Sequence, residues 1–165
     1  EDVYRRNCSK KMEESVMDDE QAVATVDEIT VIGADTVVAV DGRVLGKPRT
    51  EEDAQQMLEL LSGRTHDVFT GVCILWTNPK TPQQIQGNIF HCQTKVTFYP
   101  MTEQEIKQYA ATGDCMDKAG AYGIQSGAAK YIQGIEGDYL NVVGLPLSKI
   151  YHVLSEKLSN LTINL

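Results

Sequence analysis

The stretch VIGADTVV, residues Val31–Val38, decides how this chain folds and points to its chemistry. Its β-branched apolar residues predict a strand over 29–40, which carries a carboxylate, Asp35, followed by a hydroxyl, Thr36. A charge on a buried strand is costly unless it has a partner or a task. We therefore expect the Asp35 carboxylate to be partly desolvated, where it could bind a divalent cation or take a proton from an attacking water. The alternative is an aspartate that caps a turn at the end of the strand.

A lysine follows shortly after this strand. Asp41-Gly42 is a strong hairpin signal, and residues 43–45 are predicted to return as a short strand that leads to Lys47. The run from Gly42 to Lys47 has three residues rather than four between its glycines, and it lacks the Ser/Thr of a P-loop, so a P-loop nucleotide site is disfavoured. Lys47 can still contact a phosphate as a point charge, and the alternative is a solvated loop lysine.

Periodicity and capping signals predict the remaining elements of an α/β fold. Helices are expected over 3–17, from Thr50 with Asp53 to Gly63, from Thr102 with Glu105 to Gly113, and after Pro146. Strands are expected over 67–76, 88–99 and 129–135, with a polar surface loop over 77–87. The last helix is predicted to bury one apolar face, made by Leu147, Ile150, Tyr151, Leu154 and Leu158.

The segment DKAGAYGIQ, residues 117–125, is rich in small residues. Glycine and alanine allow a backbone to approach a ligand closely, and the segment also carries a cation, Lys118, and an amide, Gln125. An amide donates and accepts hydrogen bonds at once, which suits the edge of a nucleobase. We expect a functional loop here, and the alternative is a plain irregular connection.

Composition limits the classes of function. The chain has 165 residues, enough for one domain, and a formal net charge of −8, which argues against a nucleic-acid-binding surface. It has no long apolar stretch, so no membrane span is expected. Its four cysteines include no Cys-x-x-Cys pair, and free thiols fit a cytoplasmic setting.

Five segments together resemble the Maf family of nucleoside triphosphate pyrophosphatases. The resemblance runs from about Val3 to Leu158, and its motifs occur in the family's order. The matching segments are IGADTVV, GKP, LSGRTHDVFTGV, DKAGAYGIQ and IEGDYLNVVGLPL. The resemblance implies one domain over residues 1–165, with an α/β fold like that of inosine triphosphate pyrophosphatases. That fold has a long twisted mixed sheet with flanking helices, and two lobes around a cleft.

The resemblance also implies a reaction, in which a nucleoside triphosphate and water give the monophosphate and pyrophosphate with a divalent cation, Mg²⁺ or Mn²⁺. Asp35 matches the family's proposed general base and would share the metal. Lys47 and Lys118 match the lysines of its phosphate site. Lys11 resembles the lysine on the family's first long helix, although the neighbouring Lys10 is an equal match.

Two positions resemble those of one branch of the family. Thr36 and Gln125 match the branch that cleaves dTTP and UTP, whereas the branch that cleaves 7-methyl-GTP carries other residues there. The resemblance further implies a role in removing non-standard nucleotides, and many family members are dimers, which makes a homodimer a candidate assembly. These two residues argue against the alternative of a 7-methyl-GTP or broad-range pyrophosphatase.

The chain departs from the family at its beginning. Family members open with a strand and a Ser-x-Ser-Pro-Arg-Arg loop, followed by a glutamate on the next strand, and this sequence starts after both. Those arginines would face phosphate and that glutamate would share the metal, so we expect an N-terminally incomplete site and weak activity. The alternative function is a catalytically impaired nucleotide-binding or regulatory module.

Overall fold

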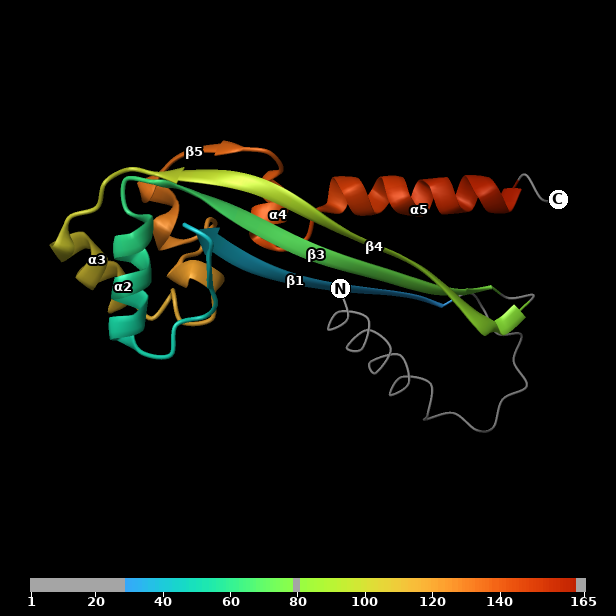
Figure 1. Ribbon diagram of the computed structural model, residues 1–165, viewed down its shortest axis with the longest axis horizontal. Coiled ribbons are helices and arrows are strands. Elements are labelled where there is room, and N and C mark those ends of the chain that lie inside the picture. Colours follow the sequence, from blue (N-terminus) through green and yellow to red (C-terminus); the bar gives the residue numbers. More distant parts are fainter. Residues whose placement is uncertain (1–28, 79–80, 163–165) are drawn as a thin grey trace. The chain divides into compact units, whose positions relative to one another are not determined.

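The computed structural model describes residues 29–78 and 81–162 (Figure 1). The predicted helix over 3–17, which includes Lys10 and Lys11, lies outside the described residues. The strands are β1 (Thr30–Val40), β2 (Arg43–Leu45), β3 (Thr65–Asn78), β4 (Thr81–Phe98) and β5 (Ile132–Glu136). The helices are α2 (Glu51–Leu61), α3 (Glu103–Ala110), α4 (Tyr139–Val143) and α5 (Leu147–Thr162).

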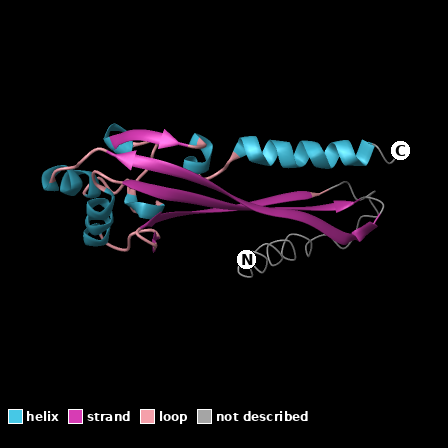
Figure 2. Ribbon diagram, turned by 45° about the horizontal axis from the view of Figure 1, so that its top comes forward, coloured by secondary structure: helices cyan, strands magenta, loops and turns pink. Residues whose placement is uncertain are grey.

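The strands form one sheet in the order β2-β1-β3-β4-β5. Figure 2 draws the strands in magenta. The outer pairs β1–β2 and β4–β5 are antiparallel. Contacts join Thr36 to Thr70 and Ile29 to Thr77, so β1 and β3 also run in opposite directions. The α/β class is confirmed, and these pairings of described strands are antiparallel where a mixed sheet was predicted.

The chain divides into two compact units, Glu1–Ala34 with Gly71–Phe90, and Asp35–Thr70 with His91–Leu165. The first unit includes the part of the β3–β4 hairpin within Gly71–Phe90. One prediction is wrong in this part of the chain. Residues 77–87 are not a loop, because β3 continues to Asn78 and β4 begins at Thr81. The Trp76 indole N–H donates to the Gln86 side chain across the hairpin at 3.0 Å. The polar residues from 83 to 89 are exposed, so they reflect solvent contact and not an irregular backbone.

Local signals fix the turn and the helix starts of the second unit. Asp41 and Gly42 both have positive φ, 50° and 72°, as a two-residue hairpin turn requires. The Thr50 hydroxyl accepts from the Asp53 amide at the start of α2. Thr102 begins α3 with a full capping box. These features confirm the predictions made from the same residues.

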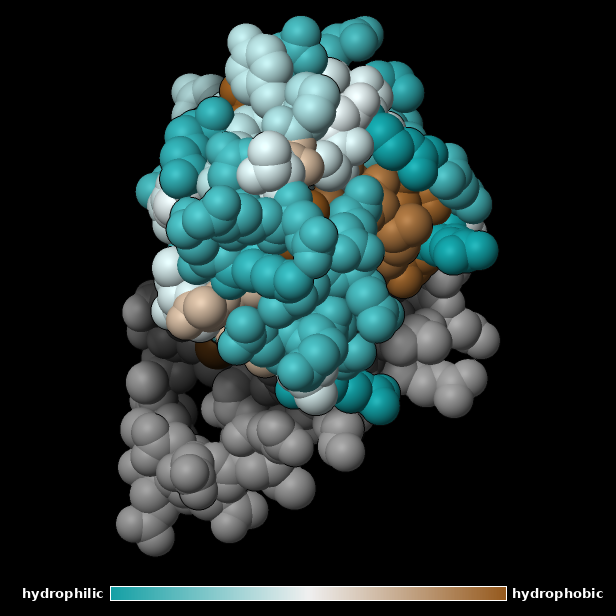
Figure 3. Space-filling view, turned by 90° about the vertical axis from the view of Figure 1, so that its left-hand side faces the viewer, coloured by the Kyte–Doolittle hydropathy of each residue, from teal (hydrophilic) through white to brown (hydrophobic). Residues whose placement is uncertain are grey.

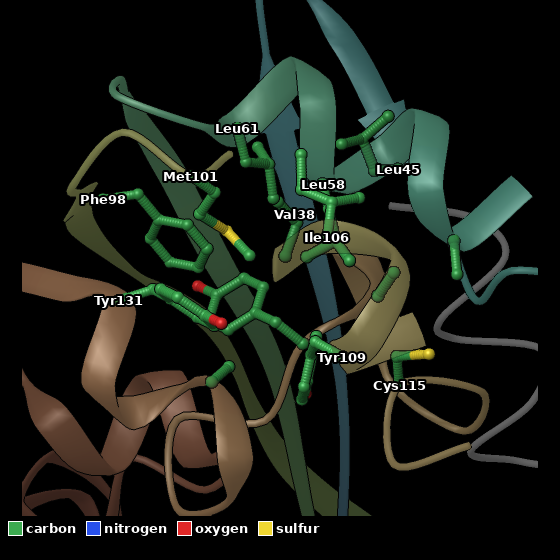
Figure 4. Packing of buried hydrophobic residues seen from close by; sticks show 14 of the residues in the cluster. Val38, Leu45, Leu58, Leu61, Phe98, Met101, Ile106, Tyr109, Cys115 and Tyr131 are labelled. Carbon is green, nitrogen blue, oxygen red and sulfur yellow. The ribbon is translucent and has the colours of Figure 1, made fainter. Parts of the chain in front are cut away.

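The core of the second unit lies where α2 and α3 pack together against the sheet (Figure 4). Helix α2 buries Ala54, Leu58 and Leu61, which recur at the spacing of one helix face. Figure 3 shows that the surface at this end is mostly hydrophilic around a smaller apolar patch. Core side chains labelled in Figure 4 are Val38, Leu45, Leu58, Leu61, Phe98, Met101, Ile106, Tyr109, Cys115 and Tyr131.

The C-terminal helices differ from the prediction. On α5 the residue Ile150 is buried, whereas Leu147 and Tyr151 are 50% and 67% exposed, so the predicted apolar face is only partly covered. Helix α4 was not predicted, because five residues are too few for a periodic signal, and it begins where Asp138 accepts from the Leu140 amide.

Candidate functional site

Asp35 lies near the middle of β1, before the residues at which the strand becomes fully buried. The amide of Thr36 donates to Asp35 Oδ1 at 2.9 Å, and no hydrogen bond from the described residues reaches Oδ2. The side chain is exposed, so the prediction of partial desolvation is wrong for the described residues. The reason is local, because complete burial along β1 begins only at Val38. An exposed carboxylate with one open oxygen remains available to a cation or a water molecule.

Thr36 is joined to a buried hydrogen-bond chain. Its hydroxyl lies 2.9 Å from the Thr70 hydroxyl on β3. Thr70 in turn donates to the backbone carbonyl of Asn141 on α4 at 2.8 Å. A Cβ at Gly144, the residue that ends α4 with φ 114°, would lie 3.4 Å from Thr36 Oγ1. The hydroxyl of Thr36 is therefore held between β3 and the end of α4.

Asn141 anchors α4 to the sheet. Its amide nitrogen donates to the Val68 carbonyl at 3.1 Å and to the Thr94 hydroxyl at 3.0 Å. Thr94 donates to the carbonyl of Asp138, the cap of α4. Asn141 and Thr94 are at most 1% exposed. Asn141 Oδ1 has no hydrogen-bond partner among the described residues, so the two hydrogen bonds of the amide nitrogen are the side-chain contacts that tie α4 to β3 and β4.

The loops that carry Lys47 and Lys118 are tied together. The amide of Gly120 donates to the carbonyl of Gly46, the residue before Lys47, at 3.0 Å. Gly120 has φ 70°, and a Cβ there would lie 2.9 Å from Val38 Cγ2 on β1. Only glycine fits both the backbone conformation and this close approach. The structure therefore brings the two predicted phosphate-site segments together beside β1.

Lys118 forms an ion pair with its neighbour. Its ammonium donates to Asp117 Oδ1 at 2.7 Å, and their side chains are 33% and 77% exposed. The carboxylate of Asp117 raises the pKa of Lys118, and Lys118, with a smaller effect of Lys47, lowers the pKa of Asp117. The stem of Lys118 lies over Gly123, where a Cβ would be 2.7 Å from Cε. An exposed pair is weak, so a phosphate can take the lysine from Asp117.

Buried and half-buried polar groups brace the rest of this loop. The Tyr109 hydroxyl on α3 donates to Asp114 Oδ2 at 2.8 Å and accepts from the Gly123 amide at 3.2 Å. Ser126 donates to the same carboxylate oxygen, and the hydrogen bonds from Ser126 and Tyr109 lower the pKa of Asp114. Burial raises the pKa of Tyr109, so it stays protonated as a donor. The segment between Lys118 and Gln125 is thus pinned at Gly123, while Gln125 itself is exposed.

The structure does not join Asp35 to the lysines. In the described part of the chain no hydrogen bond or ion pair links Asp35 to Lys47 or Lys118. Side chains alternate along a strand, so Thr36 shares the face of Val38, on which Gly120 packs, and Asp35 belongs to the other face. A shared role of Asp35 and the two lysines stays a prediction.

Sequence reasoning missed the residues that support the site. Thr70, Asn141, Tyr109 and Asp114 were not singled out, although Thr70 and Asn141 stand inside two of the quoted segments. The Thr70–Asn141 contact joins residues 71 positions apart. No local pattern carries that information.

Comparison with known proteins gives a consistent result. A family model described as Maf-like protein matches residues 1–157. A dTTP/UTP pyrophosphatase of Agathobacter rectalis is 49% identical over 132 residues, which is 80% of this chain and 63% of that relative. One of Carboxydothermus hydrogenoformans is 50% identical over 137 residues, 83% of this chain and 71% of the relative. One of Moorella thermoacetica is 45% identical over 157 residues, 94% of this chain and 78% of the relative.

The match with the Agathobacter relative covers less than two thirds of that protein's length. Among the described residues, no helix is both long enough and apolar enough to cross a membrane.

Proposed function

This chain belongs to the family of Maf-like proteins, and from that premise we propose that it is a nucleoside triphosphate pyrophosphatase that converts dTTP and UTP to their monophosphates and pyrophosphate. The observation that carries the proposal is the 45–50% identity to three relatives named dTTP/UTP pyrophosphatase. The hydrogen bond from Gly120 to Gly46 supports it, because it holds two lysine-bearing loops together as a triphosphate site requires. Removal of non-standard nucleotides is part of the same proposal.

The chemistry assigned to this chain uses one carboxylate and two ammonium groups. Lys47 and Lys118 neutralise the triphosphate, and Lys118 leaves Asp117 to do so. The open oxygen of Asp35 orients a water and accepts its proton as the water oxygen bonds to the α-phosphorus. The bond from the α-phosphorus to its bridging oxygen breaks, and pyrophosphate leaves with that oxygen.

A divalent cation fits the donors present near Asp35. Magnesium is commonly held by one or two carboxylates together with substrate phosphates and water, so a single exposed carboxylate with one open oxygen is sufficient from the protein. The described residues contain no cluster of three or more potential ligands. When bound, Mg²⁺ or Mn²⁺ would offset phosphate charge, with Asp35 as its protein ligand.

Thr36 and Gln125 are proposed to contact the base. The exposed amide of Gln125 can donate to O4 of thymine or uracil, and the Thr36 hydroxyl is held at a fixed position by Thr70. Lys11 is proposed as a further phosphate contact by resemblance alone.

The second candidate function is a nucleotide-binding module without catalysis. The exposed carboxylate of Asp35 accepts only the Thr36 amide among the described residues, so the catalytic group is less constrained than the two lysine loops. Such a module would bind dTTP without releasing pyrophosphate. Calorimetric binding and product analysis on the same sample separate the two functions.

A panel of nucleotides tests the leading proposal. We expect pyrophosphate and monophosphate from dTTP and UTP at rates at least about tenfold above those from GTP and 7-methyl-GTP. Release of orthophosphate, or equal rates across the panel, would contradict the proposal.

The proposal includes a cytoplasmic setting and a homodimer. The free thiols of Cys92 and Cys115 support a reducing environment. Light scattering on the purified chain measures the mass of the assembly, and a monomer at all concentrations contradicts the dimer.

A further inference from the structure

The hydrogen-bond chain that ends at Thr36 has a fixed direction. A carbonyl oxygen only accepts, so the 2.8 Å contact between Thr70 Oγ1 and the Asn141 carbonyl uses the single hydroxyl hydrogen of Thr70. The 2.9 Å contact between the Thr70 and Thr36 hydroxyls must then take its hydrogen from Thr36. The oxygen of Thr36 is left with lone pairs and no hydrogen for any other partner.

The groups behind Thr70 cannot reverse this direction. The Asn141 side chain must point its nitrogen at the Val68 carbonyl, and its second hydrogen goes to Thr94. The hydrogen of Thr94 goes to the Asp138 carbonyl. Thr70 and Asn141 are fully buried, so no water exchanges with these partners. The backbone carbonyl of Asn141 therefore stays beside Thr70 and continues to accept the hydroxyl hydrogen of Thr70.

We infer that Thr70 is a positioning residue that sets the Thr36 hydroxyl as a hydrogen-bond acceptor, so that Thr36 selects a substrate group that donates. The inference rests on the proposed function, in which the substrate base is thymine or uracil. Both bases carry a donor at N3–H, whereas N3 of cytosine is an acceptor and would meet a lone pair on Thr36. Thr36 is half-buried whereas Thr70 is fully buried, so of these two residues Thr36 is the one that a ligand can reach. The hydroxyl of Thr70 therefore acts on substrate choice without touching the substrate.

The test compares two ligands that differ only at N3. The probes are the α,β-methylene analogues of dTTP and of 3-methyl-dTTP, which resist cleavage and report binding by calorimetry. We expect the native chain to bind the dTTP analogue more tightly than the 3-methyl-dTTP analogue, by a larger factor than the bulk of the methyl group alone would cause. Thr70→Val keeps the volume of the side chain and frees the hydrogen of Thr36. In this variant the ratio of the two affinities, and that of the dTTP and dCTP analogues, should fall by about threefold to tenfold.

Two matched variants separate positioning from structure. Thr70→Ser keeps the hydroxyl and loses a methyl group, and it should retain the native affinity ratios. Thr70→Ala loses both groups and should behave like Thr70→Val in these ratios, whatever its stability. A merely structural role would make the ratios follow the thermal midpoint of unfolding across the three variants. That result, or a native ratio that Thr70→Val leaves unchanged, overturns the inference.

Failure of the proposed function gives a different result. A native chain that binds neither thymidine analogue overturns the substrate class and, with it, the inference. A native chain that binds both, with no change of ratio in Thr70→Val, overturns the inference alone.

Discussion

The amide nitrogen of Gly120 lies 3.0 Å from the carbonyl oxygen of Gly46, and this hydrogen bond joins the loop of Lys118 to the loop of Lys47. The two loops are more than 70 positions apart in the sequence. Gly120 also packs directly on Val38 of β1. A triphosphate carries several negative charges, so two ammonium groups on mutually fixed loops form a more ordered site than two free lysines.

Substituting Gly120 tests this relationship. Gly120→Ala forces φ 70° on an L-residue and places Cβ 2.9 Å from Val38 Cγ2, so we expect the free energy of unfolding to fall by about 2–3 kcal/mol. Gly113→Ala is the matched control, because Gly113 has φ 74° and nothing within 4 Å of the new Cβ, and should lose only about 1 kcal/mol. Urea unfolding of both variants measures the difference. Equal losses would mean that contact with Val38 adds nothing.

Gly123 controls the position of Lys118. In Gly123→Ala the new Cβ would lie 2.7 Å from Lys118 Cε and 2.4 Å from Ser126 Oγ, so the lysine stem must move. We expect the KM for dTTP to rise by about tenfold with a smaller change in kcat, because the displaced group binds phosphate.

The control for this prediction is Gly134→Ala on β5, which has open space around the new Cβ and should leave the kinetics unchanged. A native KM in Gly123→Ala would contradict the assignment of Lys118 to the phosphate site.

Local signals account for what could be predicted from the sequence. The hairpin turn at Asp41-Gly42 needs two residues that tolerate positive φ, and the caps at Thr50 and Thr102 need hydroxyls before an apolar periodic run. Each of these requirements is met within a few residues of chain. They could therefore be identified without knowledge of the tertiary structure.

The rest depends on contacts between distant segments. The strand over 81–87 has a polar composition, and only pairing with β3 makes it a strand. The exposure of Asp35 depends on which groups from other segments cover this part of β1. The alternation of apolar and polar residues along the strand does not predict which groups these are. Thr70 was overlooked because its role exists only through Thr36 and Asn141, 34 and 71 positions away.

The Asp35 carboxylate is the group that the proposed reaction requires. Asp35→Asn keeps the shape and the acceptor for the Thr36 amide but removes the charge, so we expect kcat for dTTP to fall by about 10²–10⁴-fold with an unchanged unfolding midpoint. Asp41→Asn is the control, since Asp41 directly follows the same strand and its partner is Arg64. A near-native rate in Asp35→Asn would mean that another group is the base.

The buried imidazole of His66 makes stability depend on pH. His66 is 2% exposed, its Nε2 lies 2.8 Å from the Tyr122 hydroxyl, and burial lowers its pKa from 6.5 to about 4, with the charge of Asp67 opposing. The unfolded chain therefore binds more protons than the folded chain between these two values. The contribution of His66 to stability is complete above pH 6.5 and is lost as the pH falls through the window to about 4. A shift of this size corresponds to about 3 kcal/mol.

The measurement is the free energy of unfolding in urea at several pH values from 7 to 4, in the native chain and in His66→Gln. Carboxylates also titrate in this range, so the informative quantity is the difference between the two curves. We expect the native chain to lose more stability than His66→Gln on acidification, by up to about 3 kcal/mol, because glutamine takes up no proton. If His66→Gln and the native chain lose stability in parallel, His66 takes up its proton equally in the folded and unfolded states, and burial does not exclude the charged imidazole.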